Sequence, residues 1–185
     1  GLSKIDICLI HDVDKWTHGD DVEIHFKEAM NGAYIALEKL KNEKVISAIG
    51  VGLNDSEMCS RFAESGNFDC MILAGRYTLL EQGALEDFFP IAEKKNIGVI
   101  LAGVFNSGIL IKGAGDHSTY DYTKIPDHIT KKYLEIDKIC KEFNVPVGAA
   151  ALQFSNAHKA VSTMILGMDY PNQINENIDL FNYKI

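Results

Sequence analysis

A histidine at the end of an apolar run is the residue of this sequence with the clearest capacity for chemistry. The segment 5–10 is apolar, and His11 follows it, with Asp12 and Asp14 close behind. In α/β proteins ligands bind at the carboxyl ends of parallel strands, where an imidazole could orient a substrate or move a proton. A histidine that only packs or makes a structural hydrogen bond would give the same pattern.

The same segment also admits a metal site. His11, Asp12, Asp14 and His18 offer nitrogen and oxygen ligands. Their spacing matches no ligand motif, and a strand directs neighbouring side chains to opposite faces. We therefore predict no metal.

Small and hydroxyl-bearing residues follow the other apolar runs. Segment 105–110 offers backbone donors and a hydroxyl to an anion, although a tight loop without a ligand would have the same composition. Segment 167–171 leads into a helix whose free N–H groups favour a phosphate. The carboxylate of Asp169 would repel such an anion unless it points away or caps the helix. Glycine allows close approach of a flat ligand to the backbone. The glycines concerned are Gly50, Gly52, Gly75, Gly103 and Gly167.

Five short runs rich in Ile, Val and Leu would position these residues. The runs are continuous rather than alternating, which predicts strands of a parallel sheet that is covered by helices. Between them, apolar residues recur every three or four positions, which predicts helices. The predicted strands are 5–10, 45–51, 70–73, 97–101 and 163–166, and the predicted helices are 22–42, 56–63, 80–95, 125–143 and 171–180.

Two α/β architectures fit this order: an open doubly wound sheet, or part of a (β/α)₈ barrel. A closed barrel takes about 250 residues, so a barrel would lack about three strands in a chain of 185 residues. The longest irregular stretch, 111–124, is either a loop that covers a ligand or a surface insertion.

Composition excludes several classes of protein. With 18 Lys and Arg against 26 Asp and Glu, the net charge is −8, so we expect no nucleic-acid partner. No apolar run approaches the roughly 20 residues that span a membrane. We recognise no signal peptide at the start of the sequence. The chain opens with Gly1 and enters an apolar run at once, which predicts that it is part of a longer chain. Widely spaced cysteines predict reduced thiols and a cytoplasmic protein. They are Cys8, Cys59, Cys70 and Cys140.

The sequence resembles the C-terminal part of the aldo-keto reductases, and most closely the branch of NAD-dependent L-fucose and D-threo-aldose 1-dehydrogenases. The resemblance implies that residues 1–185 are strands four to eight, with their helices, of a single (β/α)₈ TIM barrel domain. It rests on IHDVD at 10–14, AIGVGLN at 48–54, FDCMILAGRYTLLEQGAL at 68–85, GVFNSGIL at 103–110, AAALQF at 149–154 and ILGMDYPNQINEN at 165–177.

The family exchanges a hydride between a nicotinamide and a carbonyl, alcohol or sugar hemiacetal. The resemblance implies that His11 orients the reacting oxygen, while a Tyr, assisted by a Lys and an Asp, acts as general acid or base. Those three residues belong to the first three strands, which this sequence lacks. Tyr77, Tyr120 and Tyr122 are not substitutes, so we expect the chain alone to be inactive.

The resemblance also implies where the dinucleotide binds. Residues 106–108 match the pyrophosphate loop, and Glu176 and Asn177 match a pair near the adenine. The implied cofactor-binding residues are Gly52, Asn54, Phe105, Asn106, Ser107, Gly108, Gly167, Gln173, Glu176 and Asn177.

At three places where the family contacts the nicotinamide, this sequence departs from the family pattern. Gly52-Leu53 replaces a Ser-Asn pair, with Asn54 one position later. Ala74 replaces a Gln, and Ala102 replaces a stacking Tyr, for which Phe105 is a candidate substitute.

Gln173 stands where NADP-using relatives place an Arg for the 2′-phosphate. A neutral amide cannot make the charge-assisted contact of a guanidinium, so NAD is favoured over NADP. The expected reaction is oxidation of an aldose to its lactone, with pyridoxal or another aldehyde as the alternative substrate. A non-enzymatic α/β binding module, complete in itself, is the rival interpretation. The oligomeric state is not predicted.

Overall fold

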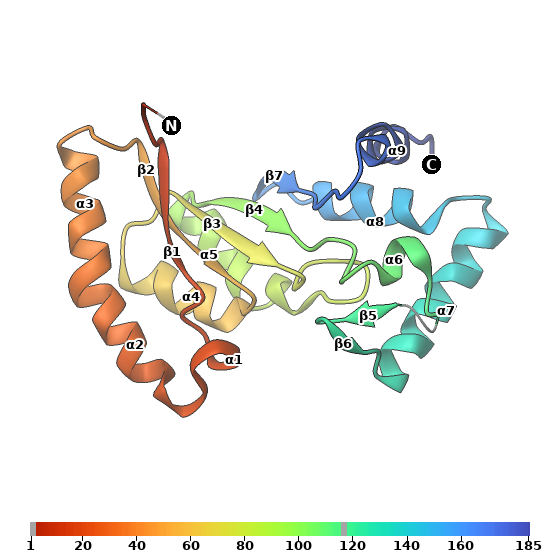
Figure 1. Cartoon of the computed structure of the whole chain (residues 1–185), viewed down its shortest axis with the longest axis horizontal. Helices are drawn as coiled ribbons and strands as arrows, with labels where there is room; N and C mark the ends of the chain where they lie inside the picture. Colours follow the sequence, from red (N-terminus) through yellow and green to blue (C-terminus); the bar gives the residue numbers. More distant parts are fainter. Residues whose placement is uncertain (1–2, 116–117) are drawn as a thin grey trace.

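Five parallel strands form one sheet in the order β1–β2–β3–β4–β7 (Figure 1). The structure, a computed structural model, describes residues 3–115 and 118–185; the remaining four residues, including two of the stretch 111–124, lie outside the described part. The parallel sheet confirms the α/β prediction. The strands are β1 (Ile7–His11), β2 (Ala48–Leu53), β3 (Cys70–Ala74), β4 (Gly98–Ala102) and β7 (Val161–Ile165).

Helices connect the strands, and a small hairpin follows β4. In Figure 1 the helices α2 and α3 lie at one end of the sheet and α7 to α9 at the other. The α-helices are α1 (Lys15–His18), α2 (Val22–Glu28), α3 (Ile35–Asn42), α4 (Ser56–Ser65), α5 (Phe88–Lys95), α6 (Ile109–Lys112), α7 (Asp127–Glu142), α8 (Val147–Asn156) and α9 (Asn172–Phe181). A π-helical segment η2 (Ala29–Tyr34) joins α2 to α3, two 3₁₀ turns are η1 (Gly19–Asp21) and η3 (Gly83–Leu85), and the hairpin strands are β5 (Thr119–Tyr120) and β6 (Thr123–Lys124).

One face of the sheet carries the hydrophobic core. Val51, Leu73 and Leu101 come from three neighbouring strands and are almost completely buried. They belong to the same cluster as Phe62 of α4 and Phe88 of α5. Burial of such large side chains against the sheet is the main source of stability for this layer.

The opposite face is much less covered. His11, Gly52 and Ile72 are partners in register across β1, β2 and β3, and the row continues through Ile100 to Thr163. These residues alternate with the core residues, so they point away from the core. Ile72 is only partly buried, and His11 is exposed. In the part of the chain that the structure describes, β1 and β7 are the two ends of the sheet and do not close it into a barrel.

The predicted helix 80–95 is too long at its start, because α5 begins only at Phe88. Thr78 explains the difference: its hydroxyl oxygen accepts the N–H groups of Leu80 and Glu81 at 3.1 Å each. The Thr78 N–H also donates to the Glu81 carbonyl oxygen at 2.7 Å. This tight turn takes up the donors that a helix start would leave free, and Asp87 caps α5 instead.

Two further differences concern the C-terminal half. Helix α8 is absent from the predicted helices, because it is apolar almost all round and shows no amphipathic period; Ala149, Ala151 and Leu152 are fully buried. The stretch 111–124 is irregular in the prediction, whereas it contains the end of α6 and the hairpin β5–β6 in the structure.

All four cysteines are free thiols, three of them buried. Within residues 3–115 and 118–185, no helix combines the length and the apolar character that crossing a bilayer requires.

Candidate functional site

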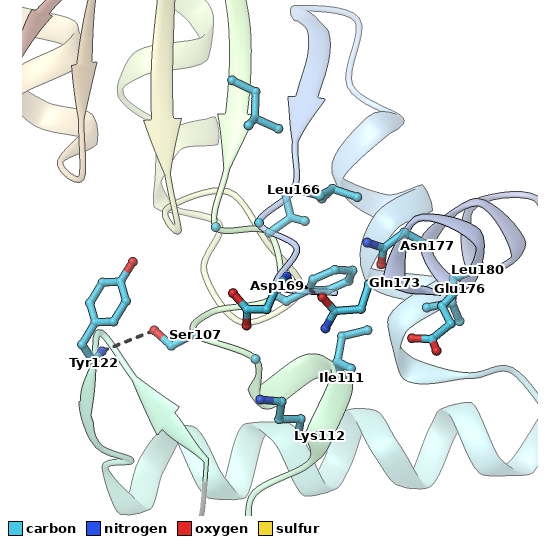
Figure 2. A pocket seen from close by; sticks show the side chains of 16 residues that line it. Ser107, Ile111, Lys112, Tyr122, Leu166, Asp169, Gln173, Glu176, Asn177 and Leu180 are labelled. Atoms are coloured by element: carbon cyan, nitrogen blue, oxygen red, sulfur yellow. Dashed lines mark hydrogen bonds between the residues drawn. The ribbon is translucent and has the colours of Figure 1, made fainter. Parts of the chain in front are cut away.

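A cavity of about 490 Å³ opens beyond the ends of β4 and β7. Figure 2 shows the loop after β4, with Ser107, on one side and helix α9 on the other. Seven residues predicted to bind a cofactor line it together: Phe105, Ser107, Gly108, Gly167, Gln173, Glu176 and Asn177. A Cβ on Gly167 would meet no atom within 4 Å, so the space beside this glycine is open.

The loop after β4 is tightly wound. Asn106, Ser107 and Gly108 all have left-handed backbones, with φ of 46°, 56° and 96°, a conformation that non-glycine residues adopt mainly where the surroundings enforce it. The Asn106 N–H donates to the Gly103 carbonyl oxygen at 2.9 Å, and the Gly108 N–H to that of Phe105 at 3.0 Å. These two donors serve the loop itself, so they are not the ones that segment 105–110 would offer to an anion.

Asn106 lies behind the cavity wall. Its side chain is 3% exposed, and its Nδ2 donates to the Gly75 carbonyl oxygen at 3.1 Å. The two loops also touch at Gly103, where a Cβ would lie 3.2 Å from the Gly75 backbone nitrogen. The side chain of Asn106 therefore holds the loop after β4 against the loop after β3.

Ser107 and Lys112 supply the donors on this side of the cavity. The Ser107 hydroxyl oxygen accepts the Tyr122 N–H at 3.3 Å (Figure 2). Its own hydrogen is thereby left for a ligand. Lys112, at the end of α6, adds an ammonium group to the same wall. Lys112 and Tyr122 are cavity residues that the sequence did not predict, although both lie in the stretch 111–124, whose length indicates a loop able to cover a ligand.

The hairpin that carries Tyr122 is fixed to the loop after β3. Arg76 and Asp121 form two hydrogen bonds, of 3.2 and 2.9 Å, between guanidinium and carboxylate. The Tyr120 hydroxyl donates to Glu81, and burial, followed by the contact with Glu81, raises the pKa of Tyr120 well above its ordinary value. Asp121 and Tyr122 both have positive φ, the geometry of the tightest hairpin turns.

Helix α9 and the loop before it form the opposite wall, which carries acidic side chains where the first wall carries Lys112. The Gln173 side-chain oxygen accepts the N–H groups of Asp169 and Tyr170 at 2.6 and 3.0 Å. The amide NH₂ of Gln173 remains for a ligand. Asp169 and Glu176 both line the cavity, so two carboxylates stand beside the Gln173 amide. This wall favours hydroxyl groups over an additional phosphate.

His11 lies apart from the cavity, at the end of β1. Its side chain is 72% exposed, and its Nδ1 lies 3.0 Å from the Asp12 carboxylate. Gly52, its partner on β2, and Asn54 are likewise absent from the cavity wall. Three of the predicted site residues thus lie outside the cavity wall, and two of them, His11 and Gly52, are partners in register.

Two other candidates from the sequence, Asp14 and Tyr77, have structural roles. The Asp14 carboxylate caps α1 by accepting the Thr17 N–H at 2.9 Å. Across the described ranges, no three His, Cys, Asp or Glu residues are arranged to hold a metal ion. Tyr77 is 5% exposed, with its ring centroid 4.7 Å from that of Phe89 in the core.

Known proteins resemble this chain over its whole length. It is 37% identical over 186 residues to a pyridoxal 4-dehydrogenase of Microbacterium luteolum, covering 100% of this chain and 54% of that protein. It is 33% identical over 180 residues to a D-threo-aldose 1-dehydrogenase of a Pseudomonas species, covering 97% and 52%. The chain thus spans about half the length of these curated relatives.

The fold comparison agrees. An aldo-keto reductase from Bacillus halodurans in its holo form superposes with a TM-score of 0.72 at 19% identity, over 98% of this chain and 54% of that one. The model of the Aldo/keto reductase family matches residues 1–185. The chain therefore belongs to the aldo/keto reductase family.

Proposed function

We propose that the protein containing this chain is an NAD-dependent oxidoreductase that oxidises the C1 hydroxyl of an aldose to give the lactone. The observation that carries the proposal is the convergence of seven residues, implied by family resemblance to bind a dinucleotide, on one cavity at the carboxyl ends of β4 and β7. Such an edge of a parallel sheet is where ligands bind in α/β enzymes.

The chain supplies strands four to eight of a (β/α)₈ barrel in this proposal. Two observations support it: the sheet ends at β1 and β7 without closing, and the chain spans about half of its relatives. The row from His11 to Thr163 would then face the barrel interior, and the remaining strands would cover it. The Tyr, Lys and Asp that the family uses would come from those strands, so the chain alone is expected to be inactive.

The cavity walls suit NAD better than NADP. Ser107 and Lys112 offer a hydroxyl and an ammonium group to a diphosphate, whereas Gln173 shares its side of the cavity with the carboxylates of Asp169 and Glu176. Carboxylates can accept hydrogen bonds from ribose hydroxyls, and they repel a 2′-phosphate. Bound NAD would supply the hydride acceptor. The protein's own part is to hold the dinucleotide and to orient the substrate oxygen through His11.

Pyridoxal is a second candidate substrate, favoured by the 37% identity to a pyridoxal 4-dehydrogenase. Pyridoxal carries a hydroxymethyl group next to its aldehyde, so it can close to a cyclic hemiacetal, as an aldose does. Oxidation of either hemiacetal removes a hydride from carbon and a proton from the hydroxyl, and it gives a lactone. The same site chemistry would serve both.

The test is to measure NAD and NADP binding and steady-state oxidation with the complete protein, across L-fucose, D-arabinose and pyridoxal. We expect tighter binding of NAD and NADH formation with a hemiacetal substrate. Activity with pyridoxal alone would overturn the aldose assignment. Absence of dinucleotide binding would overturn the proposed function altogether.

A further inference from the structure

Gly148, in the first turn of α8, lies behind the wall of the cavity beyond β4 and β7. The residue is buried, and α8 packs against both α6 and α9. A Cβ on Gly148 would lie 2.6 Å from Cδ1 of Ile111 and 3.1 Å from Cδ1 of Leu180. Both distances are shorter than the ordinary separation of carbon atoms in contact. These two side chains therefore occupy the space that a larger residue at position 148 would need.

Ile111 and Leu180 belong to the wall of the same cavity. Figure 2 shows them among its side chains, Ile111 on α6 and Leu180 on α9. The side chain of Ile111 is 46% exposed, so it is backed by α8 and open to the cavity. Gly148 itself does not line the cavity. The position of this apolar part of the wall thus depends on a residue that the ligand does not touch.

A methyl group added at position 148 would displace the Ile111 side chain. Its Cδ1 atom is the far end of a flexible chain, which can turn toward the cavity without a shift of either helix. Ala also favours a helix more than Gly does. The free protein would therefore lose little stability, whereas a ligand that fills the cavity would meet the displaced methyl group of Ile111.

We propose that Gly148 is a positioning residue for the dinucleotide: it lets Ile111 and Leu180 lie back against α8 and so keeps the cavity wide enough for this ligand. The crowding caused by a larger residue is relieved only while the cavity is empty, so its cost falls on binding and not on folding. The inference rests on the proposed function, because it takes the dinucleotide as the ligand of the cavity. It adds α8, on which no site residue was predicted, to the elements that shape the site.

Four variants of the complete protein test the inference. Gly148→Ala adds the methyl group, and its combination with Ile111→Val restores the space, because Val lacks the Cδ1 atom. The combination of Gly148→Ala with Ile109→Val is the matched control, since Ile109 is a buried residue of the same helix that does not line the cavity. Gly83→Ala is the control for the glycine substitution, because a Cβ there would meet no atom within 4 Å.

Titration with NAD, steady-state kinetics and denaturant unfolding without NAD provide the measurements. In Gly148→Ala we expect the dissociation constant of NAD to rise about fivefold or more, and KM for NAD to rise in parallel. Its kcat and its unfolding midpoint should stay close to those of Gly83→Ala. Ile111→Val should restore most of the affinity for NAD, and Ile109→Val should not.

Equal dissociation constants in Gly148→Ala and Gly83→Ala would overturn the inference, as would equal rescue by the two truncations of α6. A lower unfolding midpoint or loss of folding in Gly148→Ala would also overturn it, because the cost would then fall on the fold. If the unmodified protein fails to bind NAD, the proposed function is wrong instead. Methyl NMR of Ile111 Cδ1 without NAD would still decide whether a methyl group at position 148 displaces this side chain.

Discussion

The two faces of the sheet differ in composition and in role. The face toward the helices carries Leu73 and Leu101, which are almost fully buried among aromatic side chains. The opposite face carries the row from His11 through Gly52 and Ile72, with small or partly exposed residues. One face is packed by the described residues themselves, and the other is left partly exposed by them.

The two faces therefore have different roles: one stabilises the fold, and the other carries a candidate catalytic residue. The helix-covered face contains no candidate site residue, whereas the opposite face ends in the imidazole of His11. The cavity beyond β4 and β7 has its own support, from Asn106 and from the Arg76–Asp121 pair. Substitutions on the two faces should therefore alter different measurements, and this expectation can be tested one strand at a time.

The largest effect is expected on stability, from substitution of two neighbouring residues of β3. Leu73→Ala removes a fully buried side chain and should reduce the free energy of unfolding by about 2–5 kcal/mol. In the complete protein, Ile72→Ala should cost a similar amount, because the proposed barrel covers that face. Denaturant unfolding of the two variants measures both values. A cost below about 1 kcal/mol for Ile72→Ala would contradict the barrel, because it would leave that face open to solvent.

His11→Ala should have the next largest effect, on catalysis alone. Loss of the group that orients the substrate oxygen should lower kcat by about a hundredfold. The dissociation constant of NAD should stay unchanged, because His11 lies outside the cavity wall. Steady-state kinetics with parallel NAD titration provides the measurement. Weakened NAD binding would contradict the separation of His11 from the cavity beyond β4 and β7.

Gln173→Arg should change the preference between dinucleotides. A guanidinium next to the 2′-phosphate would contribute about 1.5–3 kcal/mol, which corresponds to about tenfold or more in the NADP to NAD affinity ratio. Gln173→Ala is the control, because it removes the hydrogen bonds to the Asp169 and Tyr170 N–H groups without adding charge. If both variants altered the affinity ratio equally, the change would come from loss of the Gln173 hydrogen bonds at the start of α9. Gln173 would then not face the ribose.

The helix-covered face was the more predictable part from sequence. Continuous apolar runs such as 70–73 and 97–101 correspond to β3 and β4 within one residue at each end. A continuous apolar run lies within one strand, so it can be recognised in the sequence without knowing which strands or helices pack against it. Helix α8 could not be predicted in this way, because a helix buried on nearly all sides has no polar face to reveal its period.

The candidate site was predictable only through resemblance, and only in part. Family motifs located seven of the residues that line the cavity, yet they did not indicate that Asn106 is buried behind it. Tyr122 and Asp12 depend on left-handed backbones. Neither position is a glycine, so the sequence carried no signal of the turn that redirects each side chain. Such conformations are imposed by tertiary contacts.

The hairpin allows the smallest and most specific test. Asp121→Asn weakens the contact with Arg76 but leaves the turn, because Asn also adopts positive φ. For a partly exposed ion pair the loss is about 1 kcal/mol, so NAD should bind up to about fivefold more weakly if the hairpin shapes the cavity through Tyr122 and Ser107. Lys141→Ala removes an exposed pair on α7 and should leave NAD binding unchanged. Titration of NAD with both variants decides the matter: equal dissociation constants would show that the cavity does not depend on the hairpin, and the cavity would then owe its shape to the buried Asn106 and to α9.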